Sequence, residues 1–241
     1  MTQDIYDPAY VADLFNKCSA RYRRWSAVAS FGFVARWRKQ CVAALPAPSL
    51  QDATVVDLMA GTGEVWPHLL RAHPDVAAIT AIDISKSMHD EAVARLHGSR
   101  AGKITHLAAN ALETDLPDGL ADAVISTFGL KTFNDAQLGI LAAQVARLLK
   151  PGGSFSLIEA GNPKGWVLHP FYRLYMDGVL PLIERLFLQG AQDFSMIGTY
   201  TKNFGNTARF AQALRAEGLD VTETKYVFGC AWGVSGTKPT S

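Results

Sequence analysis

The chain has 241 residues, of which 49% are apolar, and its formal net charge at pH 7 is +1. This length suits one large α/β domain or one domain with a small cap, and the apolar content is enough for a sizeable core. The charge balance argues against a nucleic-acid partner, because only residues 21–24 and 36–39 form short basic clusters. The three cysteines are scattered, the N-terminus is polar and no apolar run is long enough to span a bilayer, so we expect a cytoplasmic protein without a metal site or an integral membrane segment.

The first part of the chain is rich in aromatic residues. We predict that residues 7–45 are helical in two or three pieces, broken near 26–32, and that residues 1–48 form an N-terminal helical lid. Most of the rings are expected to pack on a sheet. For Tyr22, Trp25 and Phe31 a second interpretation is open, in which a helical lid lays these rings beside a cationic ligand. A cation above an aromatic ring is stabilised by roughly 0.5–2 kcal/mol.

Residues 50–149 alternate between strand and helix patterns. The strands are predicted at 54–59, 78–84, 103–108 and 123–127, and the helices at 65–73, 87–96 and 135–149. This order is typical of a doubly wound, mostly parallel sheet, here a Rossmann-like domain over 49–241. Ligands of such sheets bind at the carboxyl ends of the strands.

The segment T-V-V-D-L-M-A-G-T-G, at 54–63, is the strongest functional motif. It predicts a buried strand, a tight glycine turn and a helix that begins near Glu64, an arrangement that binds nucleotides. Asp57 lies at the strand end, and Asp83 follows at the end of the next strand, where a carboxylate can bind both ribose hydroxyls. The turn has neither the G-x-G-x-x-G spacing nor the P-loop lysine, so no phosphate is expected. A nucleoside without phosphate indicates S-adenosylmethionine (SAM).

Two further strand ends carry candidates. Asn110-Ala111 follows one strand, and the side-chain oxygen of Asn110 can accept from an adenine amino group; a simple turn-forming role is equally compatible with the spacing. Thr127 to Lys131 follows the next strand. Ser85 or Ser87 is expected only to cap a helix.

The last third of the chain changes character. Pro151-Gly152-Gly153 predicts a turn before a strand at 154–160. Residues 161–190 are apolar on more than one face, and a helical insertion is expected at about 162–205. Packing against the N-terminal helices is the first interpretation of this insertion. The others are an apolar substrate channel, a peripheral membrane contact or a homodimer face. A helix at 206–217 and a hairpin at 221–227 and 229–234 complete a seven-stranded sheet with antiparallel strands.

Nine short motifs, spread from the N-terminal helices to the C-terminus, carry a family resemblance. They are Tyr22, S-F-G at 30–32, Trp37-Arg38, D-L-M-A-G-T-G at 57–63, D-I-S-K-S-M at 83–88, F-G-L-K at 128–131, L-L-K-P-G-G at 148–153, I-E-A-G-N-P at 158–163 and G-T-K-P at 236–239. With these motifs the chain resembles the UbiE-type class I SAM methyltransferases, which C-methylate precursors of ubiquinone and menaquinone.

The resemblance implies the parts of a cofactor site. The glycine turn would hold the methionine part of SAM, Asp83 the ribose and Asn110 the adenine, while the backbone of Thr127 and Phe128 would meet the amino-acid end. The implied site comprises Asp57, Met59, Ala60, Gly61, Thr62, Gly63, Asp83, Ile84, Met88, Asn110, Ala111, Thr127 and Phe128.

The departures from the family pattern fall mostly on the acceptor side. Met59 replaces a small residue, Asn110 and Arg23 each replace an Asp, Lys131-Thr132 replaces an Arg-Asn pair, Phe194 and Met196 replace tyrosines, and Val234 replaces a His. This pattern predicts a SAM enzyme of this lineage with a different substrate or reaction.

We therefore expect methyl transfer to a small acceptor that is aromatic or prenylated. The candidate catalytic residues are Tyr22, Trp25, Lys131 and Asn134, and the candidates for a base are His169, Glu159, Lys131 and Tyr200. One alternative is an intramolecular cyclisation of SAM to azetidine-2-carboxylate and methylthioadenosine, with Asn134 or Thr132 positioning the amine. Another is a SAM-binding scaffold without turnover.

Overall fold

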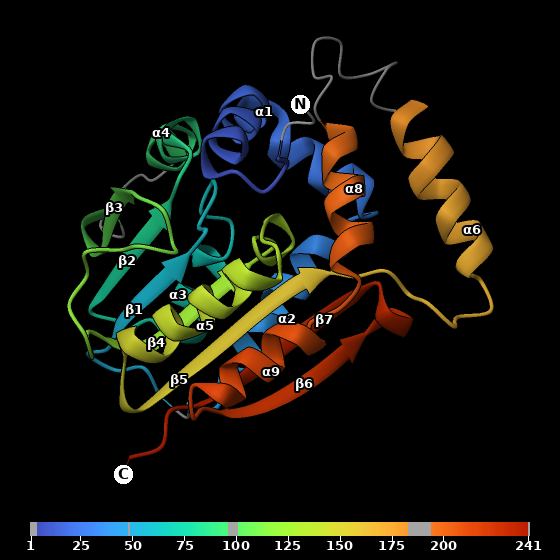
Figure 1. The fold of residues 1–241 in the computed structure, drawn as a ribbon. Helices are drawn as coiled ribbons and strands as arrows, with labels where there is room; N and C mark the ends of the chain where they lie inside the picture. Colours follow the sequence, from blue (N-terminus) through green and yellow to red (C-terminus); the bar gives the residue numbers. More distant parts are fainter. Residues whose placement is uncertain (1–3, 48, 96–100, 183–193, 241) are drawn as a thin grey trace.

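A seven-stranded sheet forms the centre of the computed structural model, which describes residues 4–47, 49–95, 101–182 and 194–240 (Figure 1). The strand order is β3-β2-β1-β4-β5-β7-β6. The strands are β1 (Thr54–Leu58), β2 (Ala78–Asp83), β3 (Ile104–Ala108), β4 (Ala121–Thr127), β5 (Leu149–Ala160), β6 (Asp220–Tyr226) and β7 (Ala231–Thr237). The first five run parallel, and β7 lies antiparallel to both β5 and β6. The predicted doubly wound sheet with a C-terminal antiparallel hairpin is confirmed.

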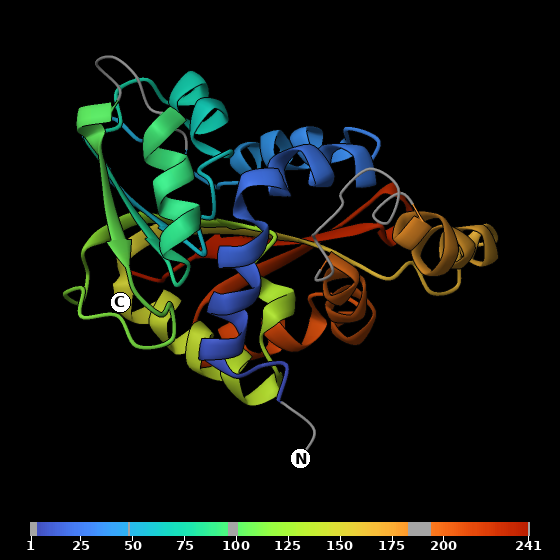
Figure 2. The ribbon, with the colours of Figure 1, turned by 90° about the horizontal axis from the view of Figure 1, so that it is seen from above.

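Helices cover both faces of this sheet (Figure 2). On one face lie α5 (Asp135–Leu148) and α9 (Ala208–Ala216), and on the other α2 (Phe33–Ala43) and α3 (Trp66–Ala72). The buried side chains of α2 recur with helical spacing at Val34, Trp37 and Cys41, as an amphipathic helix on a sheet requires. The helix α4 (Lys86–Arg95) follows β2.

The helix α1 (Pro8–Ala29) lies over the carboxyl ends of the strands (Figure 1). Asp7 caps its first turn, and its Cys18 and Trp25 share a small core with Met88 of α4. The side-chain oxygen of Asn16 accepts from the Ser85 hydroxyl at 2.7 Å and from the Ser87 amide at 3.1 Å. Of the predicted lid at 1–48, α1 therefore covers the strand ends, whereas α2 belongs to the helical layer on the sheet.

The predicted insertion is helical where the structure describes it. It contains α6 (His169–Leu174), a π-helical turn η3 (Tyr175–Val179) and α8 (Phe194–Phe204); residues 183–193 lie outside the described ranges. The Tyr175 ring lies 5.2 Å from that of Phe31, and its hydroxyl donates to the Ala29 carbonyl at 2.9 Å. The insertion thus packs against the N-terminal helices at this point. In the described part of the chain, no helix has the length and apolar character needed to cross a membrane.

The prediction of a turn at Pro151 to Gly153 is wrong. These residues belong to β5, which already begins at Leu149 by pairing with Ala121. The register then shifts between Ala121 and Ala123, and Gly152 takes a φ of +78° within this irregularity. Glycine tolerates that backbone conformation, so the bulge keeps the strand continuous where the sequence suggested a stop.

Candidate active site

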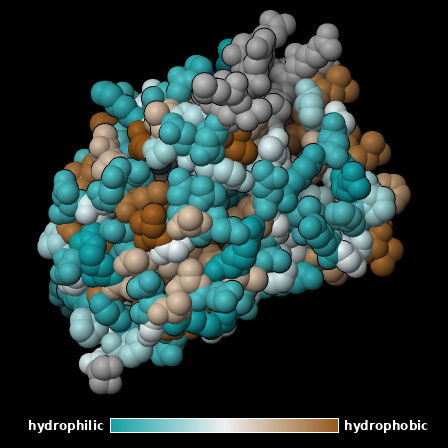
Figure 3. Space-filling view, viewed as in Figure 1, coloured by the Kyte–Doolittle hydropathy of each residue, from teal (hydrophilic) through white to brown (hydrophobic). Residues whose placement is uncertain are grey.

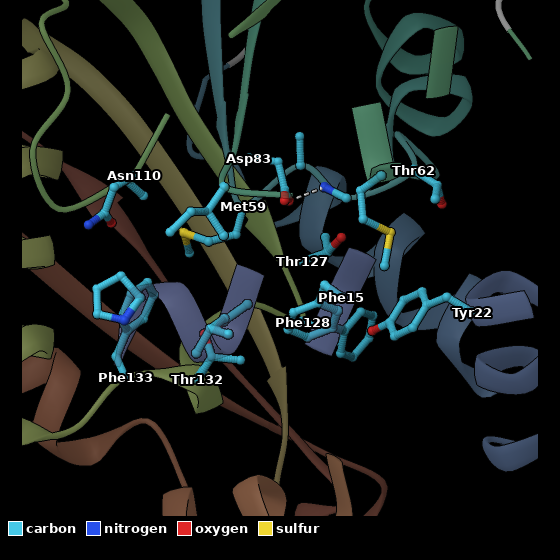
Figure 4. Close-up of a pocket in the computed structure, with 18 of the residues that line it drawn as sticks. Phe15, Tyr22, Met59, Thr62, Asp83, Asn110, Thr127, Phe128, Thr132 and Phe133 are labelled. Carbon is cyan, nitrogen blue, oxygen red and sulfur yellow. Dashed lines mark hydrogen bonds between the residues drawn. The ribbon is translucent and has the colours of Figure 1, made fainter. Parts of the chain in front are cut away.

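Two adjoining cavities lie at the carboxyl end of the parallel strands. We call the first the strand-end pocket; it has a volume of about 840 Å³, part of it open to solvent. Its walls come from α1, from the turns after β1, β2 and β3, and from the segment after β4 (Figure 4). Of the predicted cofactor residues, eleven line it: Met59, Ala60, Gly61, Thr62, Asp83, Ile84, Met88, Asn110, Ala111, Thr127 and Phe128.

The other two predicted residues, Asp57 and Gly63, lie behind the pocket wall. The indole N–H of Trp66 donates to Asp57 Oδ2 at 2.7 Å, and Asp57 is fully buried. A Cβ atom on Gly63 would come within 2.1 Å of the Trp66 ring. Gly63 is therefore needed for the close packing of α3 against the turn, and Asp57 anchors that packing instead of facing a ligand.

Burial raises the pKa of Asp57 from 3.8 to about 8, although the bond from Trp66 opposes the shift. Between about pH 4 and pH 8 the folded chain keeps this proton while the unfolded chain has lost it, so the free energy of unfolding falls as pH rises. Asp57→Asn retains an acceptor for Trp66 and removes the titration. We expect its stability profile to be flatter than that of the wild type, by up to about 1.4 kcal/mol per pH unit. Urea unfolding at several pH values tests this, and parallel profiles would contradict it.

Asp83 organises the centre of the pocket. Its Oδ2 accepts from the Gly61 amide at 2.7 Å (Figure 4). Its Oδ1 accepts from the Ser85 amide at 2.8 Å. Burial raises the pKa of Asp83, and these two backbone donors oppose the rise. Each oxygen has a second lone pair, so the carboxylate can still accept from a ligand's hydroxyl groups. Ser85 also caps α4, since its hydroxyl accepts from the Met88 amide at 3.2 Å.

Asn110 lies at one end of the pocket and already forms a turn. Its Oδ1 accepts from the Leu112 amide at 3.1 Å, and its Nδ2 donates to Glu113 at 3.0 Å. Asn110 thus has the turn-forming role that its spacing allowed. Oδ1 keeps a second lone pair, which can accept from an adenine amino group as predicted.

Two charged residues of the pocket were missed as site residues. Arg38 of α2 and Glu64 of the turn after β1 both line it and form a buried ion pair, with Nη2 and Oε2 2.5 Å apart. Within the described chain, Arg38 Nε, Glu64 Oε1 and the Thr62 hydroxyl are buried without a hydrogen-bond partner. Buried polar groups are usually hydrogen-bonded, and a polar ligand in this pocket would supply partners for these three atoms. Two signals were available in the sequence: Arg38 belongs to the Trp37-Arg38 motif of the family resemblance, and Glu64 directly follows the glycine turn.

The second cavity, which we call the apolar cavity, has a volume of about 1430 Å³, part of it open to solvent. The α1–α2 region and the insertion line it, mostly with aromatic and aliphatic side chains. Tyr22 and Phe128 line both cavities, whereas Trp25 and Lys131 line only this one. Burial strongly raises the pKa of Tyr22, which therefore stays protonated. Hydrophobic side chains gather on the surface over α6 (Figure 3), where Phe171 is 69% exposed.

Lys131 is held in a second buried ion pair. Its Nζ donates to Glu159 Oε1 and to the Phe128 carbonyl, both at 2.8 Å. Glu159 also accepts from the backbone amides of Lys131 and Ala160, so the ammonium and both carboxylate oxygens of this pair each have hydrogen-bond partners.

The remaining catalytic candidates lie elsewhere. Asn134 caps α5 by accepting from the Gln137 amide at 2.9 Å, and it lines neither of the two cavities. His169 contacts Asn162 at 3.0 Å, and the Tyr200 hydroxyl donates to the Ile5 carbonyl. None of the four candidates for a base lines the strand-end pocket. Among the described residues no group of His, Cys, Asp and Glu side chains forms an arrangement that could hold a metal ion.

Strand order, glycine turn and the acid after β2 together define a class I SAM-dependent methyltransferase fold. Solved structures of that class match it. A SAM-dependent methyltransferase from Thermotoga maritima has a TM-score of 0.61 at 16% identity, covering 94% of this chain and 99% of that one. Human N-acetylserotonin methyltransferase, solved with SAM, has a TM-score of 0.58 at 18% identity, covering 90% of this chain and 55% of that one.

The chain belongs to the ubiE/COQ5 methyltransferase family, which it matches over residues 3–238. It is 29% identical to the ubiquinone/menaquinone biosynthesis C-methyltransferase UbiE of Geobacter sulfurreducens, with 95% of this chain and 88% of that protein covered. It is 30% identical to the demethylmenaquinone methyltransferase of Deinococcus radiodurans, with 92% and 89% covered. The predicted family is confirmed.

Proposed function

We propose that the chain binds SAM in the strand-end pocket and transfers its methyl group to a small aromatic or prenylated acceptor in the apolar cavity. The observation that carries this proposal is that the two cavities share the rings of Tyr22 and Phe128. The two cavities therefore adjoin at these residues, and in this proposal the two ligands meet there. Methyl transfer is an in-line displacement that depends on such positioning and on the exclusion of water.

The pocket residues are compatible with SAM. In this proposal Asp83 would accept from the ribose hydroxyls, Asn110 from the adenine amino group, and the turn at 59–62 would approach the methionine chain. All of these residues line the pocket, and Asp83, Asn110, Met59 and Thr62 are drawn in Figure 4. The orphaned polar atoms at Thr62, Arg38 and Glu64 match a ligand with charged groups. When bound, SAM supplies an electrophilic methyl group on a sulfonium, and the Tyr22 ring, which lines the pocket, would stabilise that cation.

The apolar cavity fits a hydrophobic acceptor. Lys131 is the one charged side chain among the described residues that line it. A phenolic carbon nucleophile reacts as its phenolate. The charge of Lys131 is balanced by Glu159, whose Oε1 lies 2.8 Å from Lys131 Nζ, so this proposal assigns no side chain to activate the acceptor or to act as its base.

The decisive experiment is incubation with SAM alone and then with a panel of prenylated and simple phenols, followed by mass spectrometry of the products. We expect S-adenosylhomocysteine and a methylated phenol only when an acceptor is present. Formation of methylthioadenosine from SAM alone, with no S-adenosylhomocysteine in any mixture, would contradict methyl transfer.

One observation favours a second candidate, the intramolecular cyclisation of SAM. None of the four named candidates for a base lines the strand-end pocket, and the rings of Phe15, Tyr22 and Phe128 lie in its wall. In the cyclisation the amine nitrogen forms a bond to Cγ as the bond from Cγ to sulfur breaks. Methylthioadenosine leaves, and the proton of the amine passes to solvent. The same mass spectra distinguish the two reactions, because azetidine-2-carboxylate would accompany methylthioadenosine.

A further inference from the structure

The Arg38–Glu64 pair differs from the Lys131–Glu159 pair, which is also buried. Lys131 and Glu159 have hydrogen-bond partners for their charged groups, from each other and from the backbone. In contrast, Arg38 Nε and Glu64 Oε1 are buried and have no partner among the described residues. The side chains of Arg38 and Glu64 are only 8% and 9% exposed. A buried ion pair with unsatisfied atoms is costly unless a ligand completes its hydrogen bonds.

Both side chains face the same place in the strand-end pocket. They line it together with Thr62, whose hydroxyl is also buried without a partner. Tyr22 and Phe128 line this pocket too, and the Arg38 guanidinium lies over the Phe128 ring. In Figure 4, Thr62 and Tyr22 lie on the opposite side of Asp83 from Asn110.

The backbone explains how these residues reach the pocket. Trp37 is buried in the core between α2 and the sheet, and the next residue, Arg38, extends along the Phe128 ring with its guanidinium carbon 5.4 Å from the ring centre. Glu64 directly follows Gly63, whose lack of a side chain allows the Trp66 ring to pack there. Two elements of the sheet scaffold therefore fix one cationic donor and one anionic acceptor side by side.

We propose that Arg38 and Glu64 form a clamp for the α-amino-acid end of SAM, with Arg38 binding the carboxylate and Glu64 the ammonium. This inference rests on the proposed binding of SAM in this pocket. An unmatched donor beside an unmatched acceptor complements a carboxylate and an ammonium that share one carbon atom. The clamp makes the amino-acid group a determinant of specificity, since adenosine derivatives without it leave both charges unsatisfied.

Titration calorimetry with a series of ligands tests the clamp on the unmodified protein. The series is S-adenosylhomocysteine, its analogue without the carboxylate, and 5′-methylthioadenosine, which lacks the whole amino-acid group. We expect S-adenosylhomocysteine to bind about 10- to 100-fold more tightly than either of the others, as one or two charge-assisted hydrogen bonds predict. Equal affinities would overturn the clamp and leave the SAM site intact. Binding of none of the three would instead overturn the proposed function.

The double variant Arg38→Gln with Glu64→Gln tests the two residues directly and leaves no unpaired buried charge. We expect the double variant to bind S-adenosylhomocysteine only as tightly as it binds 5′-methylthioadenosine. Its affinity for 5′-methylthioadenosine should differ from that of the wild type by less than about 2-fold. A parallel loss of affinity for both ligands would show a structural pair and contradict the proposal. The control is Lys150→Gln with Asp122→Asn, which removes a partly exposed ion pair that lines neither cavity.

Discussion

Replacing Asp83 with Asn is expected to weaken the binding of SAM by about 100-fold. The carboxylate holds the Gly61 and Ser85 amides with one oxygen each and keeps lone pairs for the ribose. An amide has one oxygen, so its NH₂ group must face one of those two N–H donors or a ribose hydroxyl. The change therefore removes acceptors for the ligand and loosens the glycine turn at once. Titration calorimetry with SAM measures the effect.

The matched control for this experiment is Asp90→Asn. Asp90 lies on α4, and its side chain is 65% exposed and paired with Lys86. We expect this control to bind SAM as the wild type does. If Asp83→Asn kept its SAM affinity within about 3-fold of the wild type, the assignment of the ribose site would be wrong.

Removing either partner of the Lys131–Glu159 pair is expected to lower the free energy of unfolding by about 3–5 kcal/mol. Glu159→Leu should cost more than Lys131→Met. Glu159→Leu leaves a buried ammonium and two backbone amides without their acceptor. In Lys131→Met, by contrast, Glu159 still accepts from the backbone amides of residues 131 and 160. Urea unfolding of the two variants measures the difference.

Two further variants sharpen this test. Lys131→Met combined with Glu159→Gln leaves no unpaired charge and keeps an oxygen for the backbone, so it should be more stable than Glu159→Leu. Lys150→Met removes an ion pair whose side chains are 44% and 33% exposed, and its cost should stay below about 1 kcal/mol. Equal costs for Lys150→Met and Lys131→Met would show that burial does not set the strength of these pairs.

The parts of the fold that local patterns encode were predictable. The strand, glycine turn and helix at 54–72 and the acid at 83 follow from short-range periodicity and spacing, and the structure brings them together. Asn134 was assigned to catalysis, yet its Asn-x-x-Gln spacing to Gln137 is a helix-capping signature that the sequence already contained.

The remaining features depend on contacts between distant parts of the chain. Arg38 and Glu64 meet only when α2 packs beside the turn after β1, and Lys131 meets Glu159 only through the pairing of β4 with β5. An isolated charged residue carries no periodic signal of its partner. Asp57 was placed correctly at the strand end, but the direction of its side chain depends on Trp66, which the pattern of the strand cannot specify.

The rings of Tyr22 and Phe128 belong to the walls of two cavities at the same time. Such a shared partition makes the two binding equilibria mutually dependent. A ligand that shifts the Tyr22 ring on one side alters the affinity on the other, and linkage requires the reverse effect to have the same magnitude. A natural substitution at position 22 would therefore change ligand recognition in the strand-end pocket and in the apolar cavity together, so the specificity of one could not change independently of the other.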